Sequence, residues 1–283
     1  MSGRITSRMS RAHYDKLGGV NMSRLKELRR SPQHYLYALA NPKPQTPAMT
    51  LGTACHTAVL EPERFERDYA IWERKLENGK AAPRQGGAWD AFKELHAERT
   101  ILTAEEGKLA LAMSKAVRSE TLALKYLEIG DPEVTLEWIC EPYACKGRID
   151  WLTTIDNEPW IVGLKTARDC RPFLFGTQAA RLGYHLQFAF YTDGFEAITG
   201  TRPQMVEIVV ESEPPHAVAV YLIPNDIIEQ GREEYQSLLM RLHGCEETNS
   251  WPGPVPEEQY LTLPSWAYTS TDDISDLGLE LNA

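Results

Sequence analysis

The fold is decided at residues 144–170, which read Ala-Cys-Lys-Gly-Arg-Ile-Asp-Trp-Leu-Thr-Thr-Ile-Asp-Asn-Glu-Pro-Trp-Ile-Val-Gly-Leu-Lys-Thr-Ala-Arg-Asp-Cys. This pattern predicts a β-hairpin: one apolar strand ends near Leu152, a polar turn covers Asp156–Pro159, and a second strand runs over Trp160–Thr166. Such a hairpin brings Asp150 and Lys165 together, one from each strand. A carboxylate that can hold a divalent metal, beside a lysine that can orient water or stabilise charge, is a nuclease-like pairing.

The second strand of this hairpin contains an unexpected glycine. Because side chains alternate along a strand, Ile161, Gly163 and Lys165 share one face, while Val162 and Leu164 share the other. Glycine is unfavourable inside a strand, since it costs chain entropy and packs against nothing. Gly163 therefore needs a specific reason.

Composition places the chain among ordinary globular proteins. It has 283 residues, 42% hydrophobic and 25% charged. No apolar run approaches the roughly 20 residues of a membrane helix, and the N-terminus lacks an apolar signal core. We expect a cytoplasmic protein without membrane association. Its five cysteines form no Cys-x-x-Cys pair, which favours free thiols over a metal site.

Charge is distributed unevenly around a net value of −10. Residues 1–30 are rich in arginine and lysine, whereas the stretch from Pro254 to the end has no basic residue and several acidic ones. A basic front end fits local contact with phosphates, although two solvated, uneven ends are the alternative. We expect a flexible basic N-terminus at residues 1–20, one domain at 21–265 and an acidic tail at 266–283.

Periodicity predicts helices and strands in a mixed order. We expect helices at 21–28 (with Ser23 as N-cap), 31–39, 51–60, 88–97, 103–119, 173–182, 184–198 and 225–242. Strands are expected at 133–139, in the central hairpin, at 205–211 and at 217–223. Three antiparallel strands followed by helices and two more strands indicate a mixed α/β core with one sheet covered by helices.

Two further features of the helices carry polar groups. His56 lies in an apolar helix, where a lone histidine is more often structural than a ligand. Gln187 and Tyr191 stand four residues apart and so share one face of their helix.

Five blocks together resemble the RecE-type exonucleases, a phage and prophage branch of the PD-(D/E)XK nuclease superfamily. They are Leu51-Gly-Thr-Ala-Cys-His56 with Leu60-Glu-Pro, Glu133-Val-Thr-Leu-Glu-Trp138, Cys145-Lys-Gly-Arg-Ile-Asp150, Leu164-Lys-Thr-Ala-Arg-Asp169, and Gly183-Tyr-His-Leu-Gln-Phe-Ala-Phe-Tyr191-Thr-Asp-Gly. Each block is short and weak alone, but all five occur in the family's order.

The resemblance implies an αβββαβ restriction-endonuclease-like core and a metal-dependent exonuclease using Mg²⁺ or Mn²⁺. It further implies 5′-to-3′ digestion of linear double-stranded DNA, leaving 3′ single-stranded overhangs for single-strand-annealing recombination. The implied partners are a single-strand annealing protein of the RecT kind and further copies of the chain in a homo-oligomeric ring, a tetramer in preference to a trimer.

The resemblance also implies roles for individual residues. His56 and Asp150 correspond to metal ligands, Glu133 to an acidic residue acting through a metal-bound water, and the Leu164 backbone carbonyl to a further ligand. Lys165 corresponds to the lysine that orients the attacking water, and Gln187 and Tyr191 to a helix element that supports the site and the DNA end. The residues we expect to contact DNA are Ser23, Lys26, Arg29, Arg30, Arg148 and Thr166. For the basic ones on the first helices, solvated helix charges are the alternative.

Gly163 departs from the family pattern, which has Asp or Glu two residues before the lysine. The position of an acidic metal ligand is therefore vacant in the sequence, and nearby Glu158 and Asp169 are poorly placed to substitute. Either this is an inactivated form of an active enzyme, or the protein has lost or relocated a ligand. We therefore expect this sequence to cut DNA poorly, and we expect Gly163→Asp to restore digestion.

Two other functions remain open at this stage. The chain could be a non-catalytic DNA-end-binding protein on the nuclease fold, or a restriction-like endonuclease. The acidic tail could dock the annealing partner, or it could be a solvating end without a partner.

Overall fold

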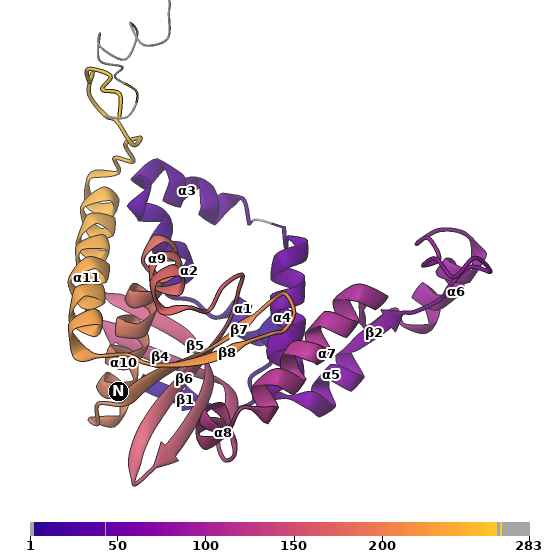
Figure 1. Cartoon of the computed structure of the whole chain (residues 1–283). Coiled ribbons are helices and arrows are strands. Elements are labelled where there is room, and N and C mark those ends of the chain that lie inside the picture. The colour runs from indigo at the N-terminus through magenta and orange to yellow at the C-terminus, as the bar shows by residue number, and fades with distance from the viewer. Residues whose placement is uncertain (1–2, 43, 265–266, 268–283) are drawn as a thin grey trace, which may run out of the picture.

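The computed structural model describes residues 3–42, 44–264 and 267. At its centre is a six-stranded sheet with the order β1-β4-β5-β6-β7-β8 (Figure 1). Neighbouring strands are antiparallel except β6 and β7, which are parallel. The strands are β1 Gly3–Thr6, β4 Asp131–Cys140, β5 Tyr143–Ile155, β6 Glu158–Ala167, β7 Gln204–Glu211 and β8 Val218–Leu222. The predicted mixed α/β sheet is confirmed.

The central hairpin is β5 and β6, longer at both ends than the sequence predicts. Its turn is the pair Asp156 and Asn157, both in the left-handed region with φ of 54° and 66°. A two-residue loop with two positive φ values has a twist that matches the twist of the paired strands. Apart from glycine, Asp and Asn are the residues that adopt positive φ most readily. The hairpin register is therefore set locally.

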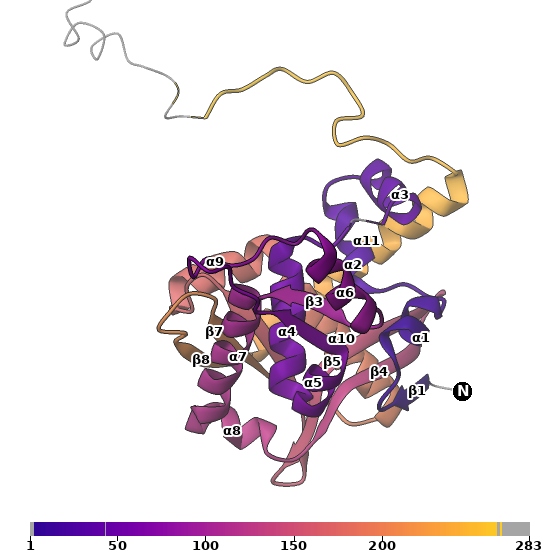
Figure 2. The same cartoon turned by 90° about the vertical axis from the view of Figure 1, so that its right-hand side faces the viewer.

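Helices cover both faces of the sheet. On one face, α10 (Tyr184–Thr199) packs Leu186 and Phe190 against Ile149 and Ile161. Leu239 and Leu242 of α11 (Asn225–Thr248) belong to the same hydrophobic cluster. On the other face, α4 (Pro47–Leu60) and α7 (Ala104–Ser119) pack Val59 and Met113 against alternate residues of β6 and β7 (Figure 2). The central strands are thus apolar on both sides, as buried parallel strands require.

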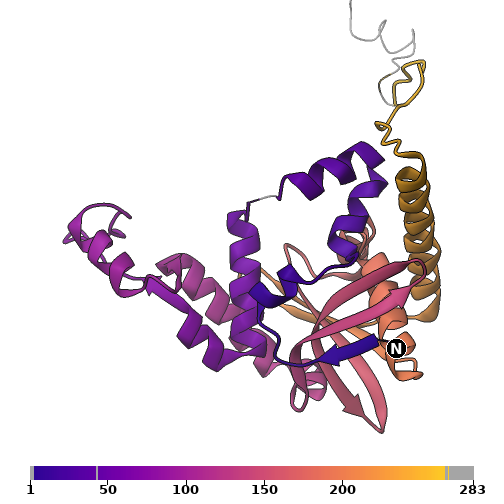
Figure 3. The same ribbon diagram turned by 180° about the vertical axis from the view of Figure 1, so that it is seen from behind.

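The remaining helices and a small second sheet lie outside this core. They are α1 Arg11–Lys16, α2 Met22–Leu25, η1 Lys26–Arg29, α3 Pro32–Ala40, α5 Pro62–Asp68, α6 Gly87–Leu95, α8 Thr121–Leu127 and α9 Pro172–Leu182. Strands β2 (Tyr69–Trp72) and β3 (Thr100–Thr103) form a parallel pair that, with α6, projects away from the main sheet (Figure 3). A capping box between Thr103 and Glu106 begins α7, next to the predicted helix start at residue 103.

The termini differ in part from expectation. Residues 1–20 were expected to be flexible, yet Gly3–Thr6 form β1 beside β4, and Tyr14 is buried in α1. Asn21, rather than Ser23, caps α2, since its side chain accepts a hydrogen bond from the Arg24 amide. The predicted acidic tail at 266–283 lies, except for residue 267, outside the described residues. In the described part of the chain, no helix combines the length and apolar character needed to cross a bilayer.

Candidate metal centre and active site

The site forms where β5 and β6 separate. Their antiparallel ladder ends at the pair Trp151 and Val162, so Asp150 and Gly163 are the first residues beyond it. The Leu164 amide donates a hydrogen bond to Asp150 Oδ2 at 2.8 Å instead. The Asp150 carboxylate is thereby held between the two strands by a backbone donor.

Lys165 lies at the centre of this opening. Its Nζ is 3.4 Å from Asp150 Oδ2 and 3.1 Å from Glu207 Oε1, and it donates to the Leu164 carbonyl oxygen at 3.2 Å. Burial opposes the ionised forms of Asp150 and Lys165, but their mutual attraction prevails: the pKa of Asp150 is lowered and that of Lys165 is raised. The predicted proximity of Asp150 and Lys165 is present in the structure.

Three potential metal ligands converge beside this lysine. His56 from α4, Glu133 from β4 and Asp150 from β5 each offer a ligand atom, and these atoms lie within 4.8 Å of one another. His56 Nδ1 is 3.8 Å from Asp150 Oδ1. The flanking pairs of β4 and β5 place Glu133 opposite Asp150, and Glu133 itself has a φ of 53° that interrupts the regular strand. Imidazole nitrogen with carboxylate oxygens is a donor set for divalent cations.

Arg148 holds Glu133 in place. The Arg148 Nε donates a short hydrogen bond to Glu133 Oε2, while its Nη1 is buried without a hydrogen-bond partner. Burial raises the pKa of Glu133, and Arg148 opposes that shift. Arg148 was expected to contact DNA; here it positions an acidic residue, and its free Nη1 retains a donor.

Gly163 is paired with Glu207, the adjacent residue of β7. A Cβ built on Gly163 would lie 2.6 Å from Glu207 Oε1 and closer still to Oε2. The place of an acidic side chain at residue 163 is thus filled by a carboxylate from the next strand. Glu207 is fully buried, and burial raises its pKa to about 7, although Lys165 opposes the shift.

Sequence reasoning did not consider Glu207 as a substitute for the missing acid. One signal was available: it is the only charged residue within the apolar run Met205–Val210. Sequence alone does not say which strand lies beside β6, so the pairing with Gly163 could not be read from it. The expectation that no nearby carboxylate takes the vacant position is corrected here.

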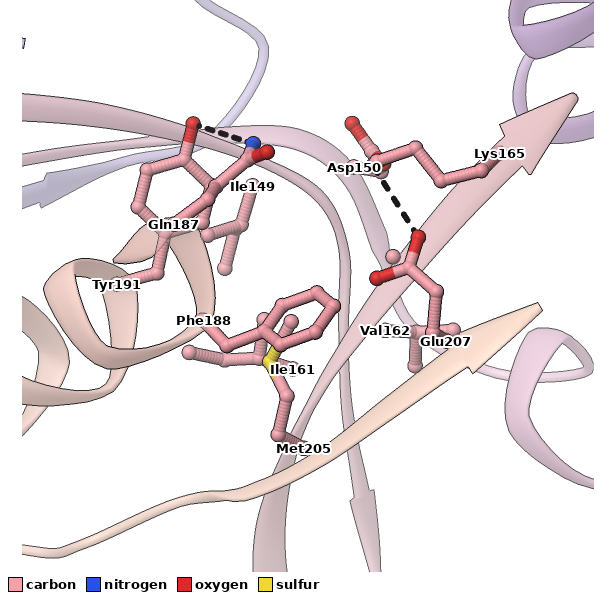
Figure 4. A pocket seen from close by; sticks show the side chains of 11 residues that line it. Ile149, Asp150, Ile161, Val162, Lys165, Gln187, Phe188, Tyr191, Met205 and Glu207 are labelled. Carbon is pink, nitrogen blue, oxygen red and sulfur yellow. Dashed lines mark hydrogen bonds and ion pairs between the residues drawn. The ribbon is translucent and has the colours of Figure 1, made fainter. Parts of the chain in front are cut away.

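Gln187 and Tyr191 extend the site along α10. Gln187 Nε2 donates to Tyr191 Oη at 3.0 Å, so their shared helix face is occupied by a hydrogen-bonded pair. Both line the same small cavity as Asp150, Lys165 and Glu207 (Figure 4). A Cβ on Gly147 would lie 2.8 Å from the Tyr191 ring, which explains a glycine at that point of β5.

The residues expected to contact DNA occupy different environments. Lys26 Nζ donates to the Leu182 carbonyl oxygen at 3.0 Å, at the end of α9, and burial lowers its pKa to about 8, with Lys165 and Arg29 adding to the shift. Arg29 pairs with Glu234 at 2.8 Å and Arg30 with Glu27 at 3.6 Å. Ser23 is exposed, and Thr166 lies half-buried near Gly52 of α4.

The donor set at the opening fits a divalent cation. His56, Glu133 and Asp150 are each partly exposed, so a cation could reach them. Among the described residues, no well-aligned hydrogen bond reaches either oxygen of the buried Glu207, whose Oε1 lies 3.1 Å from the Lys165 ammonium. A buried carboxylate next to this cluster, with only an ion pair from Lys165 to offset its burial, is compatible with a site for a hard cation.

Comparison with known proteins identifies the family and the fold of the chain. The model for the "PDDEXK-like domain of unknown function (DUF3799)" matches residues 21–264. A solved structure from Eubacterium rectale, of a protein provisionally named an exonuclease, superposes with a TM-score of 0.62 at 11% identity, covering 98% of this chain and 100% of that one. At that identity the likeness establishes the fold alone.

Weaker likenesses carry no argument. The structure of SSO0001 has a TM-score of 0.28 at 17% identity and covers 48% of this chain and 68% of its own. VC1899 from Vibrio cholerae has a TM-score of 0.22 at 13% identity, with coverages of 85% and 58%. No curated protein matches the sequence.

Proposed function

Because this chain belongs to the PDDEXK-like domain family (DUF3799), we propose that it is a metal-dependent DNA exonuclease. The observation that carries the proposal is the convergence of His56, Glu133 and Asp150, with ligand atoms within 4.8 Å of one another, beside the Lys165 ammonium. Fold by itself does not imply function, so the argument rests on this site.

The residues divide the work as their positions suggest. His56 and Asp150 would hold the cation, with the Leu164 carbonyl oxygen and, through water, Glu133 completing the set. When bound, Mg²⁺ or Mn²⁺ supplies Lewis-acid stabilisation of phosphate charge and lowers the pKa of a bound water. Lys165 places a positive charge where hydroxide attacks and where negative charge develops on the phosphate. The Gln187–Tyr191 pair bounds the cavity on the α10 side and orients what enters it.

The substrate is proposed to be linear double-stranded DNA, digested from 5′ to 3′ to leave 3′ overhangs for single-strand annealing. Support comes from the five sequence blocks shared with RecE-type exonucleases and from the name of the Eubacterium rectale neighbour. From the same resemblance we propose a homo-oligomeric ring, a tetramer in preference to a trimer, and a single-strand annealing protein of the RecT kind as partner.

The sequence led us to expect impaired catalysis because of Gly163, and this proposal does not keep that expectation. It depended on a missing carboxylate at that corner of the site, and Glu207 supplies one there. We therefore propose that the chain with its own sequence is active, and that Gly163 accompanies a different arrangement of ligands.

The decisive assay compares linear and supercoiled circular duplexes with Mg²⁺, using Asp150→Asn as the matched inactive variant. An exonuclease shortens the linear duplex and leaves the circle intact, and a 5′ label is released before a 3′ label. Nicking of the circle would indicate a restriction-like endonuclease instead. Retarded linear DNA with no shortening at any Mg²⁺ or Mn²⁺ concentration would indicate a non-catalytic end-binding protein.

Assembly and partnership are tested separately. Light scattering at several concentrations should give four times the 32.0 kDa mass of one chain for a tetramer. A single-chain mass at all concentrations rejects the ring. Co-purification with a RecT-type annealing protein, with and without residues 270–283, tests both the partnership and the tail as its docking segment.

A further inference from the structure

We propose that Glu207 is the relocated acidic ligand of this site: from the neighbouring strand β7, it takes the place that the family motif gives to residue 163, and it helps Asp150 to hold the divalent cation. The inference rests on the proposed metal site. It assigns a role to a residue that lies outside every block of the resemblance.

The position of Glu207 is the first argument. Residues 163 and 207 are direct partners in the parallel ladder of β6 and β7, so their side chains leave the sheet on the same face, which is also the face of Lys165. Adjacent strands are roughly 4.8 Å apart, a distance that a glutamate side chain can span. The Glu207 carboxylate reaches over Gly163, and a Cβ there would lie 2.6 Å from Oε1.

Burial is the second argument. Glu207 has no exposed surface, and among the described residues its carboxylate has the Lys165 ammonium 3.1 Å from Oε1 but no well-aligned hydrogen bond. Removing a carboxylate from water without hydrogen bonds is unfavourable, and apolar residues surround it on β7. Packing would be better served by an apolar side chain at this position. The ion pair with Lys165 offsets part of the cost of burial, and a cation bound beside Asp150 would offset more of it.

The geometry around Lys165 is the third argument. Its Nζ lies 3.1 Å from Glu207 Oε1 and 3.4 Å from Asp150 Oδ2, so one ammonium lies close to both carboxylates. Figure 4 shows Lys165, Asp150 and Glu207 side by side in the cavity lining. In the family motif, the acidic residue and the lysine stand two apart on one strand face and flank the metal-binding aspartate. In this chain Glu207, Lys165 and Asp150 lie together in the same way, but the acidic residue comes from β7 instead of β6.

Metal binding without DNA provides the first test. Calorimetric titration with Mn²⁺ should show affinity at least about 10-fold weaker for Glu207→Gln than for the unmodified chain, since even residues that only support a ligand cost 10- to 100-fold. Glu158→Gln, which removes a carboxylate from the exposed end of the same hairpin, is the matched control and should bind as the unmodified chain does. Equal affinity in Glu207→Gln overturns the proposal.

Moving the carboxylate from β7 to β6 gives a second test, which remains informative if one of the single variants folds poorly. Glu207→Ala and Gly163→Asp should each bind Mn²⁺ weakly, the first for lack of the acid and the second because two carboxylates crowd one space. The double variant should bind at least about 10-fold more tightly than Glu207→Ala alone. A double variant no better than Glu207→Ala refutes the exchange of roles.

The same titrations separate this inference from the proposed function. If Glu207 merely pairs with Lys165, Glu207→Gln lowers the melting temperature without metal but leaves Mn²⁺ affinity and Mn²⁺-induced stabilisation unchanged, which overturns the ligand role. If Mn²⁺ binding depends on Glu207 while no DNA is cut, the ligand role stands and the nuclease proposal fails. The two failures are therefore distinguishable.

Discussion

Glu207 lies beside Gly163 across the parallel ladder of β6 and β7, and its carboxylate fills the space that any side chain at residue 163 would need. Any side chain at residue 163 would therefore have to displace the Glu207 carboxylate. This relationship also removes the main reason for expecting Gly163→Asp to restore activity by itself, because the introduced carboxylate would collide with Glu207. We expect the single substitution to harm the site unless Glu207 is shortened with it.

Gly163→Ala should destabilise the fold by about 1–3 kcal/mol, since an added methyl in a filled interior forces neighbours to shift. Equilibrium denaturation with urea measures the change. Gly176→Ala is the control, because its Cβ would meet nothing within 4 Å on the exposed side of α9, and a helical alanine should gain up to about 1 kcal/mol. In a background of Glu207→Ala, Gly163→Ala should lower the free energy of unfolding by less. If it lowers the free energy by the same amount, the two residues do not share the space.

Lys165→Met should abolish most cleavage while sparing metal affinity. The methionine keeps the length of the side chain but removes the positive charge between Asp150 and Glu207, and losing one such electrostatic group lowers turnover about 10²- to 10³-fold. Single-turnover degradation of linear DNA at saturating Mn²⁺ measures it, with Lys93→Met on exposed α6 as control. Undiminished turnover would rule out a catalytic role for Lys165.

His56→Ala should weaken Mn²⁺ binding about 10- to 100-fold, because it removes one of three converging donors. The control is His243→Ala, which removes an exposed histidine of the same kind from α11. Thermal unfolding with increasing Mn²⁺ reports the difference, since a bound metal stabilises the folded state by an amount that grows with the logarithm of its concentration divided by Kd. If the melting temperature rises equally with Mn²⁺ in both variants, the metal does not bind at His56.

Affinity for DNA ends should fall between pH 7 and pH 9 if Lys26 contacts phosphate. Its pKa is lowered to about 8 by burial, with Lys165 and Arg29 adding to the shift, so its positive charge is present at pH 7 and mostly lost at pH 9. Anisotropy titrations at constant salt should show the decline in the unmodified chain. Lys26→Gln should bind more weakly and flatten the profile; an unchanged profile in this variant would show that another group titrates.

The sequence alone determined most of the architecture and much of the site. Alternation within residues 144–170, with a turn of two residues that accept positive φ, is local information, and it specified the hairpin that joins Asp150 to Lys165. Helix starts also depend on nearby residues, and the helices predicted to begin at residues 31 and 103 do begin next to Ser31 and Thr103, whose side chains cap them. The family blocks added His56, Glu133, Gln187 and Tyr191 by their order along the chain.

Only the tertiary structure decided what Gly163 means. The parallel pairing of β6 with β7 joins residues 44 positions apart in the chain, and their register depends on the packing of α10 and α4 on the two faces of the sheet. The burial of Glu207 and its ion pair with Lys165 are likewise properties of the assembled sheet. A gap in one strand was visible in the sequence, but the side chain that fills it comes from another strand, and only folding brings the two together.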